Sequence, residues 1–181
     1  MIQSGKFDSL KMDIKKLANT ILFFTIKRLI EMLGIIISFV GILLLISLIT
    51  YSPEDPNFIF PDNTEIKNLL GIQGSYISDL FFQSVGLIAY LIPITYIFSG
   101  INIFKSKELF LIVENSFFIV LYLLVGSLFF GYFYTNAFTL SINGNGGFIG
   151  SYLSDFFLDK INSSYNNIFF YFLLLITLIL F

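Results

Sequence analysis

Long apolar segments without charge divide this chain. No Asp, Glu, Lys or Arg occurs in four segments, which are 32–53, 80–104, 115–154 and 161–181. About 20 apolar residues are enough for a helix to cross a bilayer. We therefore expect membrane spans at about 29–51, 80–104 and 109–133, and a shorter one at 168–181. The expected fold is an all-α membrane protein with a four-transmembrane-helix domain at residues 29–181.

The fourth expected span is too short to cross a bilayer. Its apolar run at 168–181 would form roughly 21 Å of helix, against a hydrocarbon core of about 30 Å. We therefore expect that the fourth helix is truncated, and that the chain is a fragment of a longer protein or a truncated reading frame.

Small residues in the first span and a proline in the second predict local features of these helices. Gly34, Ser38 and Gly41 lie on one face of the first span, and small residues at that spacing let another helix approach closely. The alternative is that lipid merely tolerates them. Pro93 lies near the middle of the second span, which predicts a kink there.

The N-terminal segment, residues 1–28, is basic. It holds six of the ten Lys and Arg residues against two Asp, a net charge of +4. Its apolar residues recur at spacings of three and four, which predicts an amphipathic helix on a membrane surface with its lysines toward lipid phosphates. Glu31 follows four residues after Lys27, so the two side chains are placed to pair or to reach the interface.

The distribution of cations predicts an orientation. Residues 1–28 and the turn with Lys105 and Lys107 together hold eight of the ten Lys and Arg residues. By the positive-inside rule, the N-terminus and this turn lie in the cytoplasm. The loops after the first and third spans then face outward.

Composition excludes several kinds of chemistry. The chain is 56% hydrophobic and 12% charged, and it has neither His nor Cys. Zinc sites built from Cys or His, thiol nucleophiles and Ser-His arrangements are therefore excluded. No P-loop motif occurs, and the Gly-rich stretch 143–147 is better explained as a flexible turn than as a phosphate site. We expect no catalytic, cofactor-binding or metal-binding residues here.

Three acidic residues need separate interpretation. Asp55 and Asp79 belong to an acidic segment that follows the first span, where Pro56 helps to end the helix. The acids lack EF-hand spacing, so a solvated loop is favoured over a metal site. Glu114 lies one to two turns inside the third span. An acid within a membrane indicates function by default, but Lys105 and Lys107 are near in sequence, which favours a structural or interfacial role.

A short segment is repeated within the chain. Residues 71–82 and 147–158 are identical at seven of twelve positions, at a constant offset of 76. The shared residues include the pairs Gly71 and Gly147, Gly74 and Gly150, and Asp79 and Asp155. Each copy precedes a span, which predicts a parallel repeat of two-helix units. We expect a short interfacial helix in each outer loop, capped or flanked by the Asp.

The same segments resemble a known family. Residues 51–58, Tyr-Ser-Pro-Glu-Asp-Pro-Asn-Phe, resemble the P-x-D-P-S-W/F loop in the N-terminal four-helix membrane domain of the FtsK/SpoIIIE DNA translocases. Residues 68–83 are similar to that domain's N-L-G-G-x-x-G-A-x-L-A-D-x-L-F segment, and residues 85–93 to its F-G-x-x-A-Y-L-x-P segment. Residues 146–150 resemble its second Gly-rich loop. The resemblance covers about residues 28–181.

The resemblance implies a role in cell division. In that family, the membrane domain lies in the bacterial inner membrane at the division septum and tethers a cytoplasmic hexameric ATPase that pumps double-stranded DNA during chromosome segregation. This segment would then anchor the motor and contact the bilayer and other division proteins, without touching DNA. ATP and Mg would belong to the motor, through which the protein would form a homo-oligomer.

Two other functions stay open from the residues alone. One is half of a small transporter or permease, which the parallel repeat and Pro93 permit. The other is a division scaffold with no motor. Against a transporter, the chain lacks a charged or ionisable pair near the middle of its spans, which substrate and proton pathways usually need.

Overall fold

The computed structural model describes residues 2–57, 65–133, 140, 143–158 and 166–181. All regular structure within these ranges is helical, as expected. The elements in chain order are α1 (Ile2–Ile49), α2 (Gly71–Val85), the 3₁₀ helix η1 (Gly86–Tyr90), α3 (Leu91–Ser106), α4 (Phe110–Phe133), α5 (Gly147–Leu158) and α6 (Asn166–Leu180).

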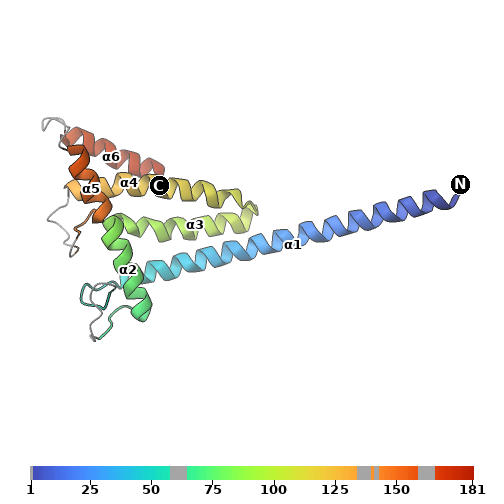
Figure 1. Cartoon of the computed structure of the whole chain (residues 1–181), viewed down its shortest axis with the longest axis horizontal. Coiled ribbons are helices and arrows are strands. Elements are labelled where there is room, and N and C mark those ends of the chain that lie inside the picture. The colour runs from blue at the N-terminus through green and yellow to red at the C-terminus, as the bar shows by residue number, and fades with distance from the viewer. Residues whose placement is uncertain (1, 58–64, 134–139, 141–142, 159–165) are drawn as a thin grey trace.

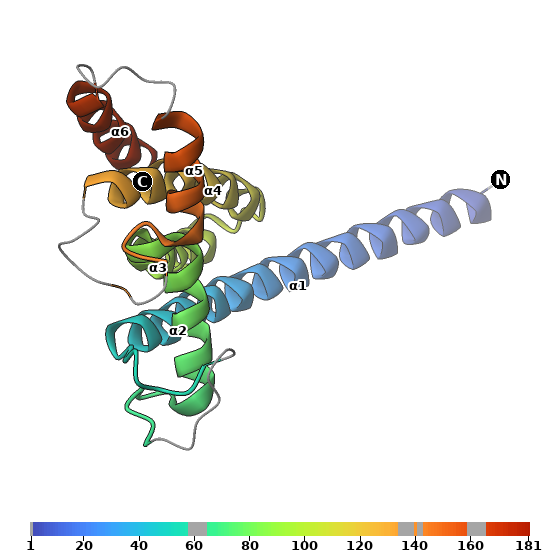
Figure 2. The same ribbon diagram turned by 60° about the vertical axis from the view of Figure 1, so that its left-hand side comes forward.

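Helices α1, α3, α4 and α6 lie side by side, and α2 and α5 lie across one end of them. Helix α1 packs along α3, and α4 packs against both α3 and α6 (Figure 1). The short helices α2 and α5 contact each other and cross the end of the bundle opposite to the α3–α4 turn (Figures 1 and 2). Helix α2 contacts α1, and α5 contacts α4.

Among the residues that the structure describes, three stretches are long and apolar enough to cross a membrane, namely Lys15–Ile49, Gly71–Ser106 and Phe110–Tyr132. Their outer surfaces carry many large apolar side chains, such as Phe39 and Phe117, that no other part of the molecule covers. Such a surface requires an apolar solvent. Helix α6, which has 15 residues, contains a shorter apolar stretch, Tyr171–Leu180.

Helix α1 continues through the position where we expect the basic segment to meet the first span. It has 48 residues without a break, because no proline or glycine occurs between Lys6 and Leu33. Its N-terminal part projects beyond the α3–α4 turn (Figure 1). The side chains of residues 15–29 are all exposed.

The second expected span, 80–104, is bent before Pro93. Helix α2 ends at Val85, and Gly86 takes a positive φ of 71° at the start of η1. Pro93 is the third residue of α3, where a missing backbone N–H removes no helical hydrogen bond. The prediction of a kink at Pro93 is therefore wrong, because proline is tolerated in the first turn and the chain turns at Gly86.

The tightest packing lies where the short and long helices meet. Leu48 of α1, Phe82 of α2, Ala89 of η1 and Tyr122 of α4 are almost completely buried together. The Tyr122 hydroxyl lies 3.0 Å from the Thr95 hydroxyl of α3. This core fixes the end of the bundle that carries α2 and α5.

Candidate functional site: a hydrogen-bonded cap and the interhelical contacts

Asp55 closes the described part of the loop between α1 and α2. Its carboxylate is buried, and its two oxygens accept hydrogen bonds from the backbone N–H groups of Lys67 and Asn68, each at 2.9 Å. A buried carboxylate is stabilised when such donors satisfy it. The expectation that the loop acids are simply solvated is therefore wrong for Asp55, whose oxygens bind backbone amides, and also for Asp79, which is buried on α2.

Asn68 ties the end of α1 to the start of α2. Its side-chain amide donates to the Ser47 carbonyl of α1 at 2.9 Å, and its side-chain oxygen accepts from the backbone N–H of Leu70 at 3.0 Å. The next turn begins at Gly71, whose φ of +67° favours glycine. Sequence reasoning did not single out Asn68, although it lies in the segment that carries the family resemblance.

Gly74 and Pro56 lie in the same network. An added Cβ at Gly74 would collide with the Asn68 side chain, so only glycine fits there. The Gly74 carbonyl accepts a hydrogen bond from the Ser47 hydroxyl at 2.7 Å, and the Pro56 carbonyl accepts one from the Ser75 hydroxyl at 2.6 Å. Both contacts hold α2 against the loop and α1.

Asp79 and Asp155 differ although they occupy equivalent positions in the repeat. Asp79 is buried in the middle of α2 and accepts a hydrogen bond from the Tyr51 hydroxyl at 3.1 Å. Asp155 is exposed on α5. Neither residue stands at a helix start, so the expectation that these acids cap the short helices is wrong; each lies eight residues after the first glycine of its helix.

The second copy of the repeat begins like the first. Gly147 has a φ of +64° and starts α5, as Gly71 starts α2. Gly150 packs on the backbone of Ser127 in α4, where a Cβ would collide with the Ser127 carbonyl. The Ser127 hydroxyl donates to the Val85 carbonyl at 2.9 Å, and the backbone N–H of Leu87 donates to the Asn145 carbonyl at 2.9 Å. These two hydrogen bonds join α4 and the segment before α5 to the end of α2 and the start of η1.

Gly34 and Gly41 lie in the contact between α1 and α3. A Cβ on Gly34 would stand 2.7 Å from the Gly100 carbonyl oxygen, and one on Gly41 would stand 3.0 Å from the Pro93 carbonyl oxygen. Ser38, between them, donates to the Ile97 carbonyl at 3.0 Å. The small residues therefore allow the backbones of the two helices to touch, and Pro93 contributes its carbonyl to that contact.

A charged cluster joins α1 to the α3–α4 turn. The Glu31 carboxylate lies 2.5 Å from the Arg28 guanidinium and 2.8 Å from the Lys107 ammonium group. The expected partner Lys27 makes no ion pair with Glu31 in the described part of the chain, where Arg28 and Lys107 already occupy the two carboxylate oxygens. Of the two lysines near Glu114 in sequence, Lys107 pairs with Glu31 instead. Glu114 is exposed and makes no ion pair within the described ranges.

A second ion pair stands at the opposite end of the molecule. Glu54 pairs with Lys67 at an exposed position in the cap, which consists of the described loop residues 51–57 and 65–70 together with α2. The hydrogen bond from Lys67, and then its charge, hold the pKa of Glu54 below the ordinary value of 4.5. No group of three acidic side chains that could hold a metal ion occurs in the part of the chain that the structure describes.

Comparison with known proteins identifies the family of this arrangement. Residues 26–181 match the sequence model of the 4TM region of DNA translocase FtsK/SpoIIIE. The chain is 34% identical to the DNA translocase FtsK of Rickettsia bellii over 74 residues, which are 41% of this chain and 10% of that protein. No solved structure matches the chain.

Two further relatives are also DNA translocases FtsK. That of Azospirillum brasilense is 32% identical over 87 residues, or 47% of this chain and 14% of the relative, and that of Caulobacter vibrioides is 37% identical over 69 residues, or 38% and 8%. The aligned regions thus span about a tenth of the length of these relatives. Since the family match covers most of the helices described above, this chain belongs to the family of the 4TM region of the DNA translocases FtsK and SpoIIIE.

Proposed function

We propose that this chain anchors a DNA-translocating motor in the inner membrane of a bacterium and positions it at the division septum. The observation that carries the proposal is the family match over residues 26–181, which includes nearly all of the membrane-length helices. The motor itself lies outside these 181 residues, because they contain no P-loop. This segment therefore performs no catalysis, and ATP and Mg belong to the motor.

The charges support an orientation with the N-terminus in the cytoplasm. Arg28 and Lys107 lie at the end of the bundle that carries the α3–α4 turn, and the N-terminal part of α1, whose sequence holds five further lysines, projects beyond that end (Figure 1). The Asp55 network and both short helices lie at the other end. By the positive-inside rule, the first end faces the cytoplasm and the second faces outward. A motor attached on the cytoplasmic side would then reach the chromosome, and this segment would not contact DNA.

The cap supplies a rigid outer surface for other division proteins. Asp55, Asn68 and Ser75 bind backbone groups of both the loop and α1, so the described parts of the loop, 51–57 and 65–70, and α2 keep a fixed position on α1. A surface that is already ordered loses little conformational freedom when a partner binds. We therefore assign recognition of division partners to this end of the molecule.

Localisation in cells tests the proposal. A fluorescent fusion of residues 1–181 should concentrate at midcell, and an equally abundant fusion of an unrelated four-helix membrane protein should spread over the whole membrane. Uniform fluorescence from both fusions would contradict septal targeting and favour a transporter half. Midcell fluorescence together with a stop codon soon after codon 181 in the genome would favour a motor-less division scaffold.

Cysteine labelling tests the orientation separately. The chain contains no Cys, so single substitutions give unambiguous sites. Glu54→Cys in the cap and Ser106→Cys in the α3–α4 turn are both at exposed positions. A membrane-impermeant maleimide added to spheroplasts should label the first variant, and the second only after the membrane is opened. The reverse pattern would overturn the orientation.

A further inference from the structure

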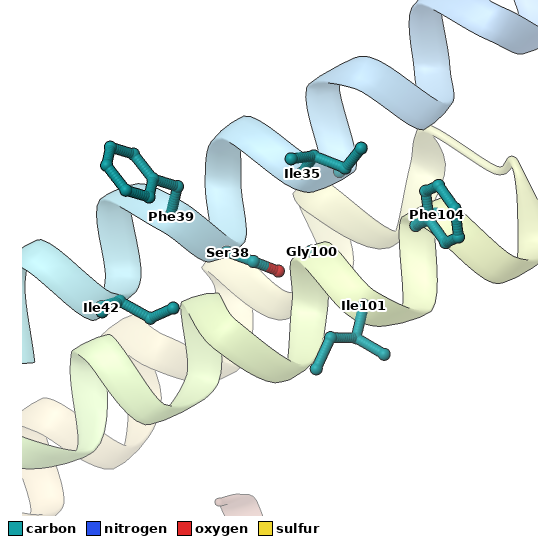
Figure 3. Close-up of a pocket in the computed structure, with 8 residues that line it drawn as sticks. Ile35, Ser38, Phe39, Ile42, Gly100, Ile101 and Phe104 are labelled. Carbon is teal, nitrogen blue, oxygen red and sulfur yellow. The ribbon is translucent and has the colours of Figure 1, made fainter.

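An apolar groove runs along the surface between α1 and α3. Its floor is the close contact around Gly34, Ser38 and Gly100, and its volume is about 360 Å³. Its walls are large apolar side chains of both helices, namely Ile35, Phe39, Ile42, Ile101 and Phe104 (Figure 3). The one side-chain oxygen on the floor, that of Ser38, already donates to the Ile97 carbonyl. An occupant of this groove must therefore be apolar.

The groove leads toward the charged cluster at the α3–α4 turn. Glu31 precedes Gly34 by one helical turn on α1, and Lys107 follows Phe104 by three residues on α3. Their ion pair of 2.8 Å thus stands at one end of the groove. Beside it, the Arg28 guanidinium rests 5.0 Å from the centre of the Phe24 ring, which holds it along α1.

Positive charge predominates at this end of the groove. Lys27 and Lys105 are exposed there, and neither makes an ion pair within the described residues. With Arg28 and Lys107, the cluster has four cations, against the carboxylates of Glu31 and Glu108. Four positive and two negative groups leave a net charge of +2. Arg28 and Lys107 are partly exposed and each has further N–H donors beyond the one that contacts Glu31.

We propose that this groove binds an anionic phospholipid from the leaflet next to the α3–α4 turn. One acyl chain would lie between Phe39 and Phe104, and the phosphate would accept hydrogen bonds from Arg28 and Lys107. Basic pockets between membrane helices recognise anionic headgroups in this way. The lipid would lie against both α1 and α3 and so stabilise their contact.

The charges favour a lipid over a second copy of this chain. A symmetric pair that met along this groove would bring the four cations of one cluster near those of the other, at an electrostatic cost that is large near the low-dielectric core of the bilayer. A zwitterionic lipid would carry its own ammonium group into the same cluster. An anionic headgroup is the one of the three that lowers the local excess of positive charge.

Tryptophan fluorescence tests the proposal, because the chain has no Trp of its own. Phe39→Trp places a reporter in the groove wall, and Phe117→Trp places a matched reporter on α4, outside the groove; the native side chains are 58% and 61% exposed. Each 181-residue variant is placed in vesicles of phosphatidylcholine and phosphatidylglycerol, of which one or the other is brominated to quench nearby Trp. We expect brominated phosphatidylglycerol to quench the groove reporter preferentially, and both lipids to quench the α4 reporter equally.

Charge substitutions and salt then test the headgroup site. In the Phe39→Trp background, Arg28→Gln with Lys107→Gln should reduce the preference roughly fivefold for each cation removed. Lys15→Gln with Lys16→Gln removes the same charge farther along α1 and should leave the preference unchanged. Raising the salt from about 0.1 M to about 1 M should abolish the preference of the groove reporter without any charge substitution, because the screening length falls from about 10 Å to about 3 Å.

Three outcomes would overturn the proposal. Equal quenching of the groove reporter by both lipids would show that the groove does not select an anionic headgroup. Protection from both lipids would show that a protein surface, such as a second copy, fills the groove. A preference that persists at high salt would show that the cations do not create it, and the salt series gives this result even if the double charge variant fails to insert.

Discussion

Asp55 binds the backbone N–H of Asn68, and Asn68 in turn binds the last turns of α1 through the Ser47 carbonyl. Both side chains are buried, and both contacts join segments that are distant in sequence. The loop after α1 is thus held to the membrane helices by a continuous line of hydrogen bonds. Removal of one member leaves buried polar groups unpaired, which costs more than the bond itself.

Asp55→Ala should therefore destabilise the chain strongly. The backbone N–H groups of Lys67 and Asn68 would lose their acceptor, and the bond from Asn68 is buried, at a cost of roughly 3 kcal/mol. Asp55→Asn keeps one side-chain oxygen and should lie between wild type and Asp55→Ala. Thermal unfolding in detergent, followed by circular dichroism, measures the order of the three proteins.

The neighbouring residue provides a matched control. Glu54→Ala removes an equal charge and breaks an exposed ion pair with Lys67, so its unfolding temperature should stay close to that of wild type. The pKa of Glu54 lies below 4.5, so the small contribution of this pair is complete above that pH and is lost as the pH falls through the lowered pKa. Equal unfolding temperatures of the two alanine variants would refute the role assigned to Asp55.

Gly34→Leu and Gly41→Leu should separate α1 from α3. At both positions the added Cβ meets backbone atoms, which cannot move aside as a flexible side chain can. Overpacking of this kind typically costs about 1–3 kcal/mol. Both variants should give less folded protein and a lower unfolding temperature, measured by size-exclusion chromatography and circular dichroism. Ile36→Leu on the exposed side of α1 is the control; if it is as harmful as Gly34→Leu, the helix contact is not the cause.

Much of the fold follows from hydropathy and residue size. Uncharged runs predict the long helices because a bilayer imposes their length, and Gly34 and Gly41 predict a helix contact because they lie on one face. Hydropathy does not predict where an apolar run changes direction, however. Residues 80–85 are as apolar as those of α3, so the turn at Gly86 that separates them is hidden within one apolar run.

The candidate site was less predictable. Local spacing pairs Glu31 with Lys27, whereas the structure pairs it with the neighbouring Arg28 and with Lys107, which is 76 residues away. Such a partner becomes visible only when α1 and α3 are placed side by side. Asn68 and Ser127 bind backbone carbonyls of α1 and α2, respectively, and the identity of an Asn or Ser residue does not predict which carbonyl it binds. The acidic composition of the loop likewise suggests solvation, although Asp55 is buried.

The Glu31–Lys107 pair should couple α1 to the α3–α4 turn. Glu31→Gln and Lys107→Gln should each lower the unfolding temperature, and the double variant should unfold no lower than the worse single variant, because both substitutions break the same contact. Glu108→Gln, an exposed acid in the same turn, is the control. Strictly additive shifts in the double variant would show that the two groups do not interact.

Of two adjacent residues on α4, only Asn115 should be sensitive to substitution. Asn115 donates a hydrogen bond to the Ser99 hydroxyl of α3, so Asn115→Leu should weaken the α3–α4 contact by about 0.5–1.5 kcal/mol. Glu114 is exposed and makes no ion pair in the described part of the chain, so Glu114→Gln should leave both stability and midcell fluorescence unchanged. Unfolding temperature and the midcell fraction of a fluorescent fusion measure the two effects. Loss of midcell fluorescence from a stable, abundant Glu114→Gln protein would show that this carboxylate takes part in targeting, because no packing interaction would have been removed.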